Sequence, residues 1–241
     1  MANLHFILQG KGGCGKSIVA STLAQHYLDQ GKTPLCFDTD PVNRTFTSIS
    51  ALNVQIVDLS IDGNIVAREF DGLMEAANNA SEDSVVIIDN GASTFLPLSA
   101  YLKENDAIGY LKSLGHSIMF HSVITGGQAL LDTMSGLEAL LINFPNVPVT
   151  VWVNEYFGKA EMNGTSFEQT KLFNNPKYKI HALITLKALK KETFGYDIDH
   201  MLRERLTFNE AIQSADFSIM AKQRLVMTQK RINEQITQAN L

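Results

Sequence analysis

One stretch near the N-terminus decides how this chain folds: Gly10-Lys11-Gly12-Gly13-Cys14-Gly15-Lys16-Ser17. It satisfies the pattern G-x-x-x-x-G-K-[ST], with an apolar run before it and a helical pattern after it. Glycines let the backbone turn so that its N–H groups face phosphate oxygens, and the helix N-terminus adds a positive dipole end. We therefore expect a phosphate-binding loop in which Lys16 contacts the β- and γ-phosphates and the Ser17 hydroxyl ligates Mg²⁺. The alternative is a glycine-rich strand-to-helix turn that binds no ligand.

Outside this loop, short apolar runs rich in β-branched residues alternate with helical patterns. Strands are expected at residues 4–9, 34–38, 54–59, 84–89, 117–124, 147–154 and 179–186, and helices at 16–29, 65–78, 128–144 and 218–239. Strands that are apolar on both faces and alternate with helices are typical of a buried parallel sheet. We expect a three-layer α/β fold, a mainly parallel twisted sheet with helices on both faces, in a single domain spanning residues 1–241. The polar segment 155–175 is expected to be a mobile insertion.

Composition places the chain among ordinary globular proteins. Hydrophobic residues make up 45% of the 241 residues and charged residues 19%, which excludes a disordered or fibrous chain. The only two cysteines, Cys14 and Cys36, are too few for a disulfide framework, so we expect a reducing compartment. No apolar run reaches the roughly 20 residues of a membrane-spanning helix, and the N-terminus lacks the basic flank of a signal peptide. The sequence therefore predicts a cytoplasmic protein without a transmembrane segment.

Charge is unevenly distributed along the chain. The net charge of −5 argues against a protein whose whole surface binds nucleic acid, yet residues 155–241 hold 13 basic and 10 acidic side chains. The helix expected at 218–239 places Ile219, Val226, Ile232 and Ile236 at near-helical spacing, with basic side chains on its other faces. Three roles remain open for this helix: packing on its own sheet, binding DNA phosphates, and binding a membrane surface or a protein partner.

Carboxylates follow two of the predicted strands, at the edge where open parallel sheets bind their ligands. Asp38 and Asp40 lie two residues apart, so both side chains point the same way, toward the expected metal and γ-phosphate. Asp89 ends another apolar run, where a carboxylate holds Mg²⁺ directly or through water. The alternative for Asp38 and Asp40 is an ordinary strand-to-turn boundary, where aspartate and proline are common.

The segment Lys11-Gly12-Gly13-Cys14-Gly15-Lys16-Ser17 resembles the deviant Walker A motif of the ParA/MinD family of ATPases. The resemblance implies that the ligands are ATP and Mg2+, and that Lys11 reaches the nucleotide held by the other subunit of an ATP-dependent homodimer. It also implies that Asp40 positions the attacking water and that Asp38 binds the Mg²⁺ shell, through water, beside Ser17 and Asp89. The expected catalytic residues are thus Lys11, Lys16 and Asp40. The alternative for Lys11 is a solvated loop lysine.

The same resemblance implies which residues bind the nucleotide. In the family an asparagine after the sixth strand contacts adenine, and Asn154 is the matching position, with a turn cap as the alternative. The chain lacks the Asn/Thr-Lys-x-Asp sequence of GTPases, so ATP is favoured over GTP. The expected nucleotide-binding residues are Gly10, Lys11, Gly12, Gly13, Cys14, Gly15, Lys16, Ser17, Ile18 and Asn154.

Further segments resemble plasmid conjugal-transfer and plasmid-stability members of the family, among them residues 38–43, 88–93, 125–132 and 192–195. This resemblance implies a slow, partner-stimulated ATPase in conjugative transfer or plasmid maintenance, together with a protein of that machinery. Two segments depart from the wider family. Val42-Asn43-Arg44 replaces the Gln-Gly-Asn of partition ATPases, which argues against simple chromosome partition. Asn90-Gly91-Ala92-Ser93 replaces a segment with two prolines, which leaves its geometry open.

Two functions of other classes remain open. One is an ATP-dependent small-molecule kinase or synthetase on the same scaffold, and the other is a binding module that holds ATP as a dimer latch without hydrolysing it. An iron-sulfur electron carrier is excluded, because Cys14 lies in the phosphate loop and Cys36 in a strand. Two interpretations remain for Cys14: a redox-sensitive thiol of lowered pKa at a helix N-terminus, or the filler of a small apolar slot.

Overall fold

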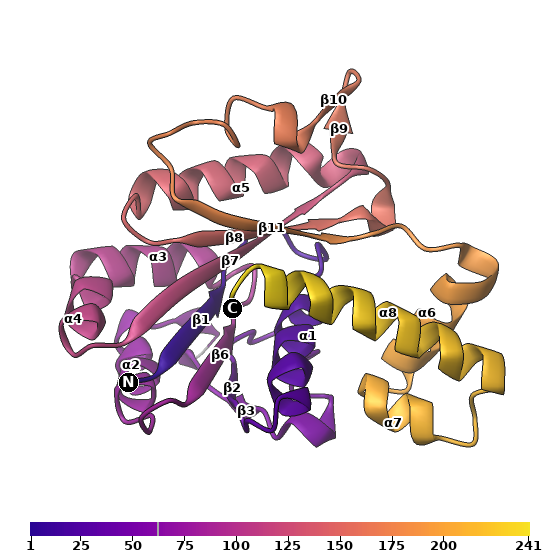
Figure 1. The fold of residues 1–241 in the computed structure, drawn as a ribbon. Helices are drawn as coiled ribbons and strands as arrows, with labels where there is room; N and C mark the ends of the chain where they lie inside the picture. Colours follow the sequence, from indigo (N-terminus) through magenta and orange to yellow (C-terminus); the bar gives the residue numbers. More distant parts are fainter. Residues whose placement is uncertain (62) are drawn as a thin grey trace.

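The computed structural model describes residues 1–61 and 63–241. Seven parallel strands form one sheet in the order β11-β8-β7-β1-β6-β2-β3. These strands are β1 (Asn3–Ile7), β2 (Leu35–Asp38), β3 (Gln55–Ile56), β6 (Val85–Asp89), β7 (Ser117–Thr125), β8 (Val149–Asn154) and β11 (Ile180–Leu186). The helices are α1 (Lys16–Asp29), α2 (Phe70–Asn78), α3 (Phe95–Glu104), α4 (Ala107–Ser113), α5 (Leu130–Asn143), α6 (Tyr196–Arg203), α7 (Phe208–Gln213) and α8 (Ile219–Gln238). Helices cover both faces of the sheet, which confirms the predicted fold class (Figure 1).

Successive side chains of a strand point to opposite faces of the sheet, and this explains why helices pack on both faces. In β6, Val86 and Ile88 face one hydrophobic core, whereas Val85 and Ile87 face the other. Helices α2, α3, α4 and α5 close the first core, and α1 with the C-terminal half of α8 closes the second. Because both faces of the sheet are buried, the strand sequences are continuous apolar runs.

The strand order places the carboxyl end of β1 at the centre of the sheet. β1 pairs with β6 on one side and with β7 on the other, and β2 lies beyond β6. From β1 the chain crosses to β2, whereas from β6 it crosses back to β7, so the chain leaves these two adjacent strands in opposite directions. A crevice at such a point is where open α/β sheets bind ligands, and the phosphate loop follows β1 directly.

Some predicted elements differ in extent. The helix expected at 65–78 begins only at Phe70, because the strands β4 (Ser60–Ile61) and β5 (Asn64–Ile65) form an antiparallel hairpin. The strand expected at 54–59 keeps only Gln55–Ile56. The segment 155–175 contains a second hairpin, β9 (Glu161–Met162) and β10 (Thr165–Ser166), and is anchored in the first core by the buried Phe167. Its mobility, like the single-domain boundary, stays a prediction.

The C-terminal helical module consists of α6, α7 and the first half of α8, and projects beside the sheet (Figure 1). It has a hydrophobic core of its own, formed by Met201, Phe208, Ala211, Phe217, Ala221 and Leu225. The apolar face expected for α8 is therefore only partly buried. Ile232 and Ile236 pack inward, but Ile219 is 85% and Val226 40% exposed. The buried stripe instead runs through residues 221, 225, 228, 232 and 236, because the first half of α8 packs on α6 and α7 and not on the sheet.

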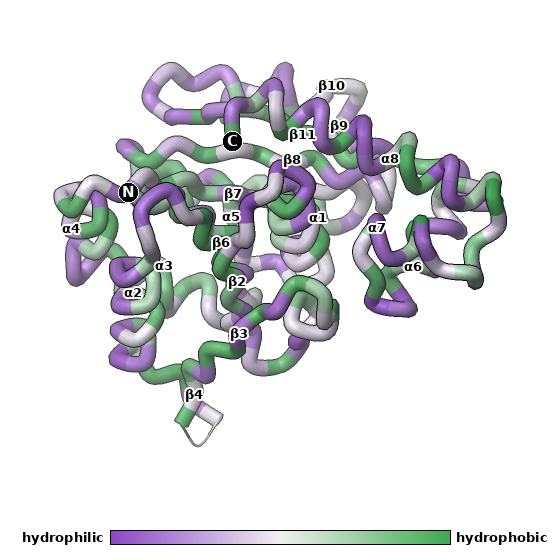
Figure 2. The backbone as a smooth tube through the Cα atoms, turned by 60° about the horizontal axis from the view of Figure 1, so that its bottom comes forward, coloured by the Kyte–Doolittle hydropathy of each residue, from purple (hydrophilic) through white to green (hydrophobic). Residues whose placement is uncertain are grey.

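Hydrophilic and hydrophobic residues alternate along α8, the longest helix described (Figure 2). A helix that spans a bilayer would be apolar along its whole length. Within the described ranges 1–61 and 63–241, no helix combines the length and the apolar character that crossing a membrane requires.

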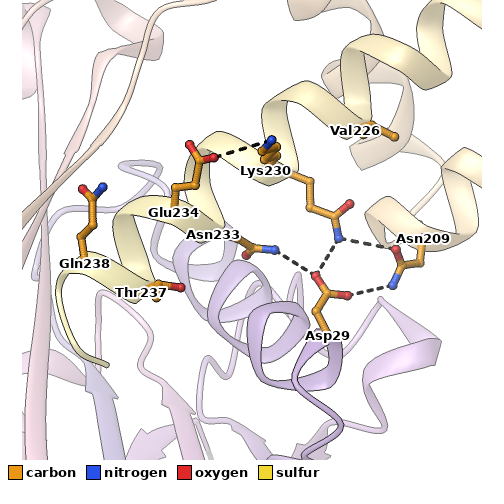
Figure 3. Close-up of a pocket in the computed structure, with 9 residues that line it drawn as sticks. Asp29, Asn209, Val226, Lys230, Asn233, Glu234, Thr237 and Gln238 are labelled. Atoms are coloured by element: carbon orange, nitrogen blue, oxygen red, sulfur yellow. Dashed lines mark hydrogen bonds and ion pairs between the residues drawn. The ribbon is translucent and has the colours of Figure 1, made fainter.

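The C-terminal helical module is joined to the sheet body at the C-terminus of α1 (Figure 3). There the Asp29 carboxylate accepts hydrogen bonds from Asn209 Nδ2 at 3.0 Å, Gln229 Nε2 at 2.8 Å and Asn233 Nδ2 at 3.0 Å. An open groove of about 620 Å³ runs along this joint, and because several of its polar groups bond one another, it fits a helix junction better than a ligand site.

Candidate nucleotide site

The phosphate loop joins β1 to α1 through a turn that requires glycine. Gly13 and Gly15 have φ angles of +71° and +106°, a region that residues with a Cβ rarely adopt. Gly15 immediately precedes α1, and no side chain caps the start of that helix. The first N–H groups of α1 are thus left as hydrogen-bond donors for an anion, as the sequence predicted for a phosphate.

The two lysines of the loop are held in different ways. Lys16 is buried, and its Nζ donates to the carbonyl oxygen of Lys11 at 3.1 Å, so its charge lies inside the loop. Lys11 is partly exposed, and its Nζ forms an ion pair with Asp132 Oδ2 at 2.8 Å. An exposed pair of this kind contributes only about 0.2–1 kcal/mol, so Lys11 can exchange Asp132 for another anion at small cost. A cavity of about 310 Å³ opens beside this pair, between the loop and α5.

Gln9 supports the loop from the sheet side and was missed by the sequence analysis. Its side chain is fully buried, and Nε2 donates to the carbonyl oxygens of Val123 at 3.0 Å and Thr133 at 2.9 Å. A Cβ on Gly136 of α5 would lie 2.0 Å from Gln9 Oε1, so this close approach requires glycine. The available signal was a polar amide at the end of a mainly apolar run.

The carboxylates predicted at the carboxyl edge do come together. Asp38 and Asp89 are register partners at the ends of β2 and β6. Asp38 Oδ1 accepts from the Asp40 backbone N–H at 3.0 Å, and its Oδ2 accepts from the N–H and the hydroxyl of Thr47 at 3.1 and 2.8 Å. These bonds hold Asp38 and fix the start of the segment that carries Asp40.

Asp89, like Asp38, is buried. Burial raises its pKa to about 7, and the nearby charges of Asp38 and Asp40 act in the same direction, whereas Ser17 and Lys16 oppose the shift. In the described part of the chain, Asp89 Oδ1 is a buried oxygen without a hydrogen-bond partner. A buried, unpartnered oxygen among like charges is a site that favours a cation.

The residues around Asp89 fit Mg²⁺. The Ser17 hydroxyl and the Asp38 and Asp89 carboxylates are oxygen groups of the kind that Mg²⁺ prefers. Across residues 1–61 and 63–241 there is no group of three or more His, Cys, Asp or Glu side chains that could hold a metal by itself. The set present therefore fits a Mg²⁺ that takes its remaining ligands from phosphate oxygens and water.

Asn154 ends β8 and lies against the phosphate loop. Its Nδ2 donates to the Cys14 carbonyl oxygen at 3.0 Å, and its Oδ1 accepts from the Tyr156 N–H at 3.1 Å. A Cβ on Gly15 would lie 2.7 Å from Asn154 Nδ2, which is a second reason for glycine at that position. The turn-capping role is thus present in the structure, and contact with adenine stays a prediction.

Cys14 fills a buried slot beneath the loop. Burial raises the pKa of its thiol, and this effect exceeds the opposing effect of Lys16. The interpretation of Cys14 as a thiol of lowered pKa is therefore wrong, because desolvation outweighs the helix terminus and the lysine.

No protein-family model matches the chain. Two curated Escherichia coli proteins, each named Protein TraL, are 46% and 45% identical to it over 240 residues, 99% of this chain and 99% of each relative. Among solved structures, the septum site-determining protein MinD from Pyrococcus horikoshii, complexed with Mg-ADP, has a TM-score of 0.56 at 14% identity and 99% coverage of both chains. A ParA family ATPase from Chlorobium tepidum has a TM-score of 0.53 at 16% identity, covering 94% of this chain and 97% of its own. At these identities the two structures show a shared fold.

Proposed function

The chain belongs to the TraL family and has the fold of MinD and ParA-family proteins, and from this premise we propose that it is an ATP-dependent dimerisation switch. It binds Mg·ATP, hydrolyses it slowly, and acts in the cytoplasm in plasmid conjugative transfer or plasmid maintenance. Its partner is a protein of that machinery. One observation carries the proposal: the glycine loop, the buried Lys16 and the carboxylates of β2 and β6 meet at one edge of the sheet, with Lys11 on the exposed side of the loop.

The loop and its neighbours bind the nucleotide. Backbone N–H groups of the loop and the ammonium of Lys16 contact the β- and γ-phosphates. Ser17, Asp38 and Asp89 hold Mg²⁺, which neutralises charge on the phosphates when it is bound. The pKa of Asp89, raised first by burial and then by the neighbouring carboxylates, supports this assignment, since a bound cation offsets both effects.

Asp40 positions the water that attacks the γ-phosphate. Its Oδ1 accepts hydrogen bonds from the N–H groups of Val42 and Asn43, both at 2.9 Å. This turn fixes the carboxylate and leaves Oδ2 to accept a hydrogen bond from the water. The transition-state charge is then stabilised by Lys16 and by Lys11 of the second copy of the chain.

The exposed position of Lys11 supports the proposed dimerisation. Its ammonium lies on the exposed side of the loop, and its pair with Asp132 is weak enough to be exchanged for a phosphate of the other subunit. ATP binding and association are then one event, because each site is completed by a lysine of the partner.

Solution mass measured by light scattering, with Mg·ATP and with ADP, tests the switch. We expect ATP to double the mass of the wild type and Lys11→Ala to remain monomeric. Lys177→Ala, which removes an exposed lysine remote from the loop, should dimerise like the wild type. An equal mass in every state would refute the cross-subunit role of Lys11 and favour a monomeric small-molecule kinase or synthetase.

The non-hydrolysing latch is the second candidate, because it needs only the loop with its buried Lys16 and the exposed Lys11, and makes no use of Asp40. Phosphate release by the wild type and by Asp40→Ala separates the two functions. Turnover that disappears in Asp40→Ala, with the ATP-bound dimer retained, supports the switch. A wild type that forms the dimer and releases no phosphate is the latch.

A further inference from the structure

The segment after Asp89, where the sequence departs from the two prolines of relatives, is organised by Asn90. This side chain is fully buried, and its Oδ1 accepts hydrogen bonds from the hydroxyls of Thr39 at 3.0 Å and Thr94 at 2.7 Å. Its Nδ2 donates to the Gly91 carbonyl oxygen at 3.1 Å. Asn90 thus ties together the ends of β2 and β6 and the residue that precedes α3.

Gly91 lies directly against Asp40. A Cβ on Gly91 would lie 2.9 Å from both Cα and Cγ of Asp40, closer than side-chain contacts allow. The φ angle of Gly91 lies outside the left-handed region, so the demand for glycine is one of space and not of backbone conformation. The Gly91 backbone therefore packs directly against Asp40, with no room for a side chain between them.

Contacts continue from this segment to the phosphate loop. The Thr39 N–H donates to the Asp89 carbonyl oxygen at 3.0 Å, which anchors the residue before Asp40 on β6. On the other side, Phe95 begins α3 next to Thr94, and a Cβ on Gly10 would lie 3.0 Å from its ring. Asp40 and the loop are therefore connected through one packed, hydrogen-bonded set of residues.

We propose that Asn90 and Gly91 are positioning residues that fix Asp40 relative to the phosphate loop. A proline holds a turn by fixing φ, whereas here a buried amide holds it by bonding three segments. The inference rests on the proposed function, because it requires Asp40 to position the water for ATP hydrolysis. It predicts an effect on turnover and not on binding, since ATP is held by the loop, and a displacement of about 1 Å can cost roughly a hundredfold in rate.

Gly91→Ala tests the contact with Asp40. The added methyl must displace the Asp40 segment, so we expect kcat for phosphate release at saturating Mg·ATP to fall at least roughly tenfold. The Kd for ATP should stay within about twofold, because the loop contacts are unchanged. Gly72→Ala is the matched control, since a Cβ at Gly72 in α2 meets nothing within 4 Å. A kcat for Gly91→Ala within about twofold of the wild type overturns the proposal.

The Thr39 hydroxyl tests the role of Asn90 with a smaller change. Thr39→Val keeps the shape of the side chain and removes the hydroxyl that bonds Asn90 Oδ1 and the Asp89 carbonyl oxygen, whereas Thr39→Ser keeps that hydroxyl. We expect valine to lower kcat without changing the Kd for ATP, and serine to restore kcat. Tyr101→Phe, which removes a 2.6 Å hydrogen bond to Asp71 elsewhere, controls for a general loss of stability. If Tyr101→Phe lowers kcat as much as Thr39→Val, the effect is structural and the positioning role is refuted.

The same assays distinguish failure of this inference from failure of the proposed function. A wild type that releases no phosphate removes the proposed function, and the positioning role falls with it. If the wild type turns over and Asp40→Ala does not, while Gly91→Ala and Thr39→Val keep the wild-type kcat, the positioning role alone is refuted.

Discussion

Acid should destabilise this protein through a pair of histidines buried between the sheet and α1. His5 on β1 and His121 on β7 are joined by a hydrogen bond of 2.9 Å between Nδ1 and Nε2. Trp152 Nε1 lies 3.0 Å from His121 Nδ1, and the Tyr27 hydroxyl lies 3.0 Å from His5 Nε2. All four side chains are buried, so a proton added to either ring would place a charge in the core.

The donors fix the protonation of both rings. The indole N–H of Trp152 can only donate, so Nδ1 of His121 accepts and its proton is on Nε2. That N–H donates to Nδ1 of His5, which therefore carries its own proton on Nε2, toward the Tyr27 oxygen. All the hydrogen bonds in this series, from Trp152 to Tyr27, can form only when both imidazole rings are neutral.

Burial lowers the pKa of His5 from 6.5 to about 4 and lowers the pKa of His121 well below 6.5. A base whose pKa falls on folding binds fewer protons in the folded state, so its contribution to stability is complete above pH 6.5. The contribution is lost as the pH falls from 6.5 toward the folded pKa of about 4. At about 1.4 kcal/mol per pKa unit the loss for His5 is about 3 kcal/mol, and His121 adds a loss of the same sign. Against a typical total of about 5–15 kcal/mol, a loss of this size is large enough to measure.

Urea unfolding between pH 7.5 and pH 4.5 measures this loss. The double variant His5→Gln/His121→Gln keeps a donor and an acceptor at each position but cannot titrate, so its free energy of unfolding should fall less steeply with pH than that of the wild type. Equal slopes for the wild type and the double variant would show that the buried rings are not the neutral pair derived above.

Three further outcomes are expected. Asp132→Asn releases Lys11 from a pair of about 0.2–1 kcal/mol and should tighten the ATP-dependent dimer by no more than about fivefold per lysine in sedimentation equilibrium; a loss of dimer would contradict this. Cys14 should react with iodoacetamide more slowly than a free peptide thiol, by mass spectrometry, because burial raises its pKa; equal rates would refute its burial. Arg224→Met leaves the buried carboxylate of Asp197 unpaired, so Tm should fall and amide exchange in α6 should accelerate, whereas unchanged exchange would show that the pair does not hold the module.

Periodicity revealed the long elements of the fold and missed the short ones. All seven strands of the main sheet lie within or next to predicted runs, because burial on both faces leaves a continuous apolar signal. Helices α4, α6 and α7 have only 7, 8 and 6 residues, too few for a helical period to emerge. In α3, Pro97 stands in the first turn, where proline is tolerated, although it interrupts a helical pattern in the sequence.

The candidate site was predictable where its residues are contiguous. The phosphate loop, Asp38, Asp40 and Asp89 follow strand ends, and parallel pairing brings strand ends together. The contact between Lys11 and Asp132 joins residues 121 positions apart, so it depends on how α5 packs on β7 and no local pattern encodes it. For Asn90, the sequence shows that the segment 90–93 lacks the two prolines of the wider family. It does not show that the Asn90 side chain bonds Thr39 after β2 and Thr94 before α3.

Helix α1 relates the nucleotide loop to the C-terminal helical module. It begins at Lys16 and ends at Asp29, 14 residues that span about 21 Å at about 1.5 Å per residue. A carboxylate at a helix C-terminus is opposed by the helix dipole, so Asp29 would destabilise α1 in isolation. Three amide N–H groups, from α7 and α8, satisfy that carboxylate and turn an unfavourable terminus into the joint that holds the module (Figure 3). Because one helix carries the uncapped N–H groups beside the loop at one end and this joint at the other, a tilt of α1 at the loop must also move the module or break these hydrogen bonds.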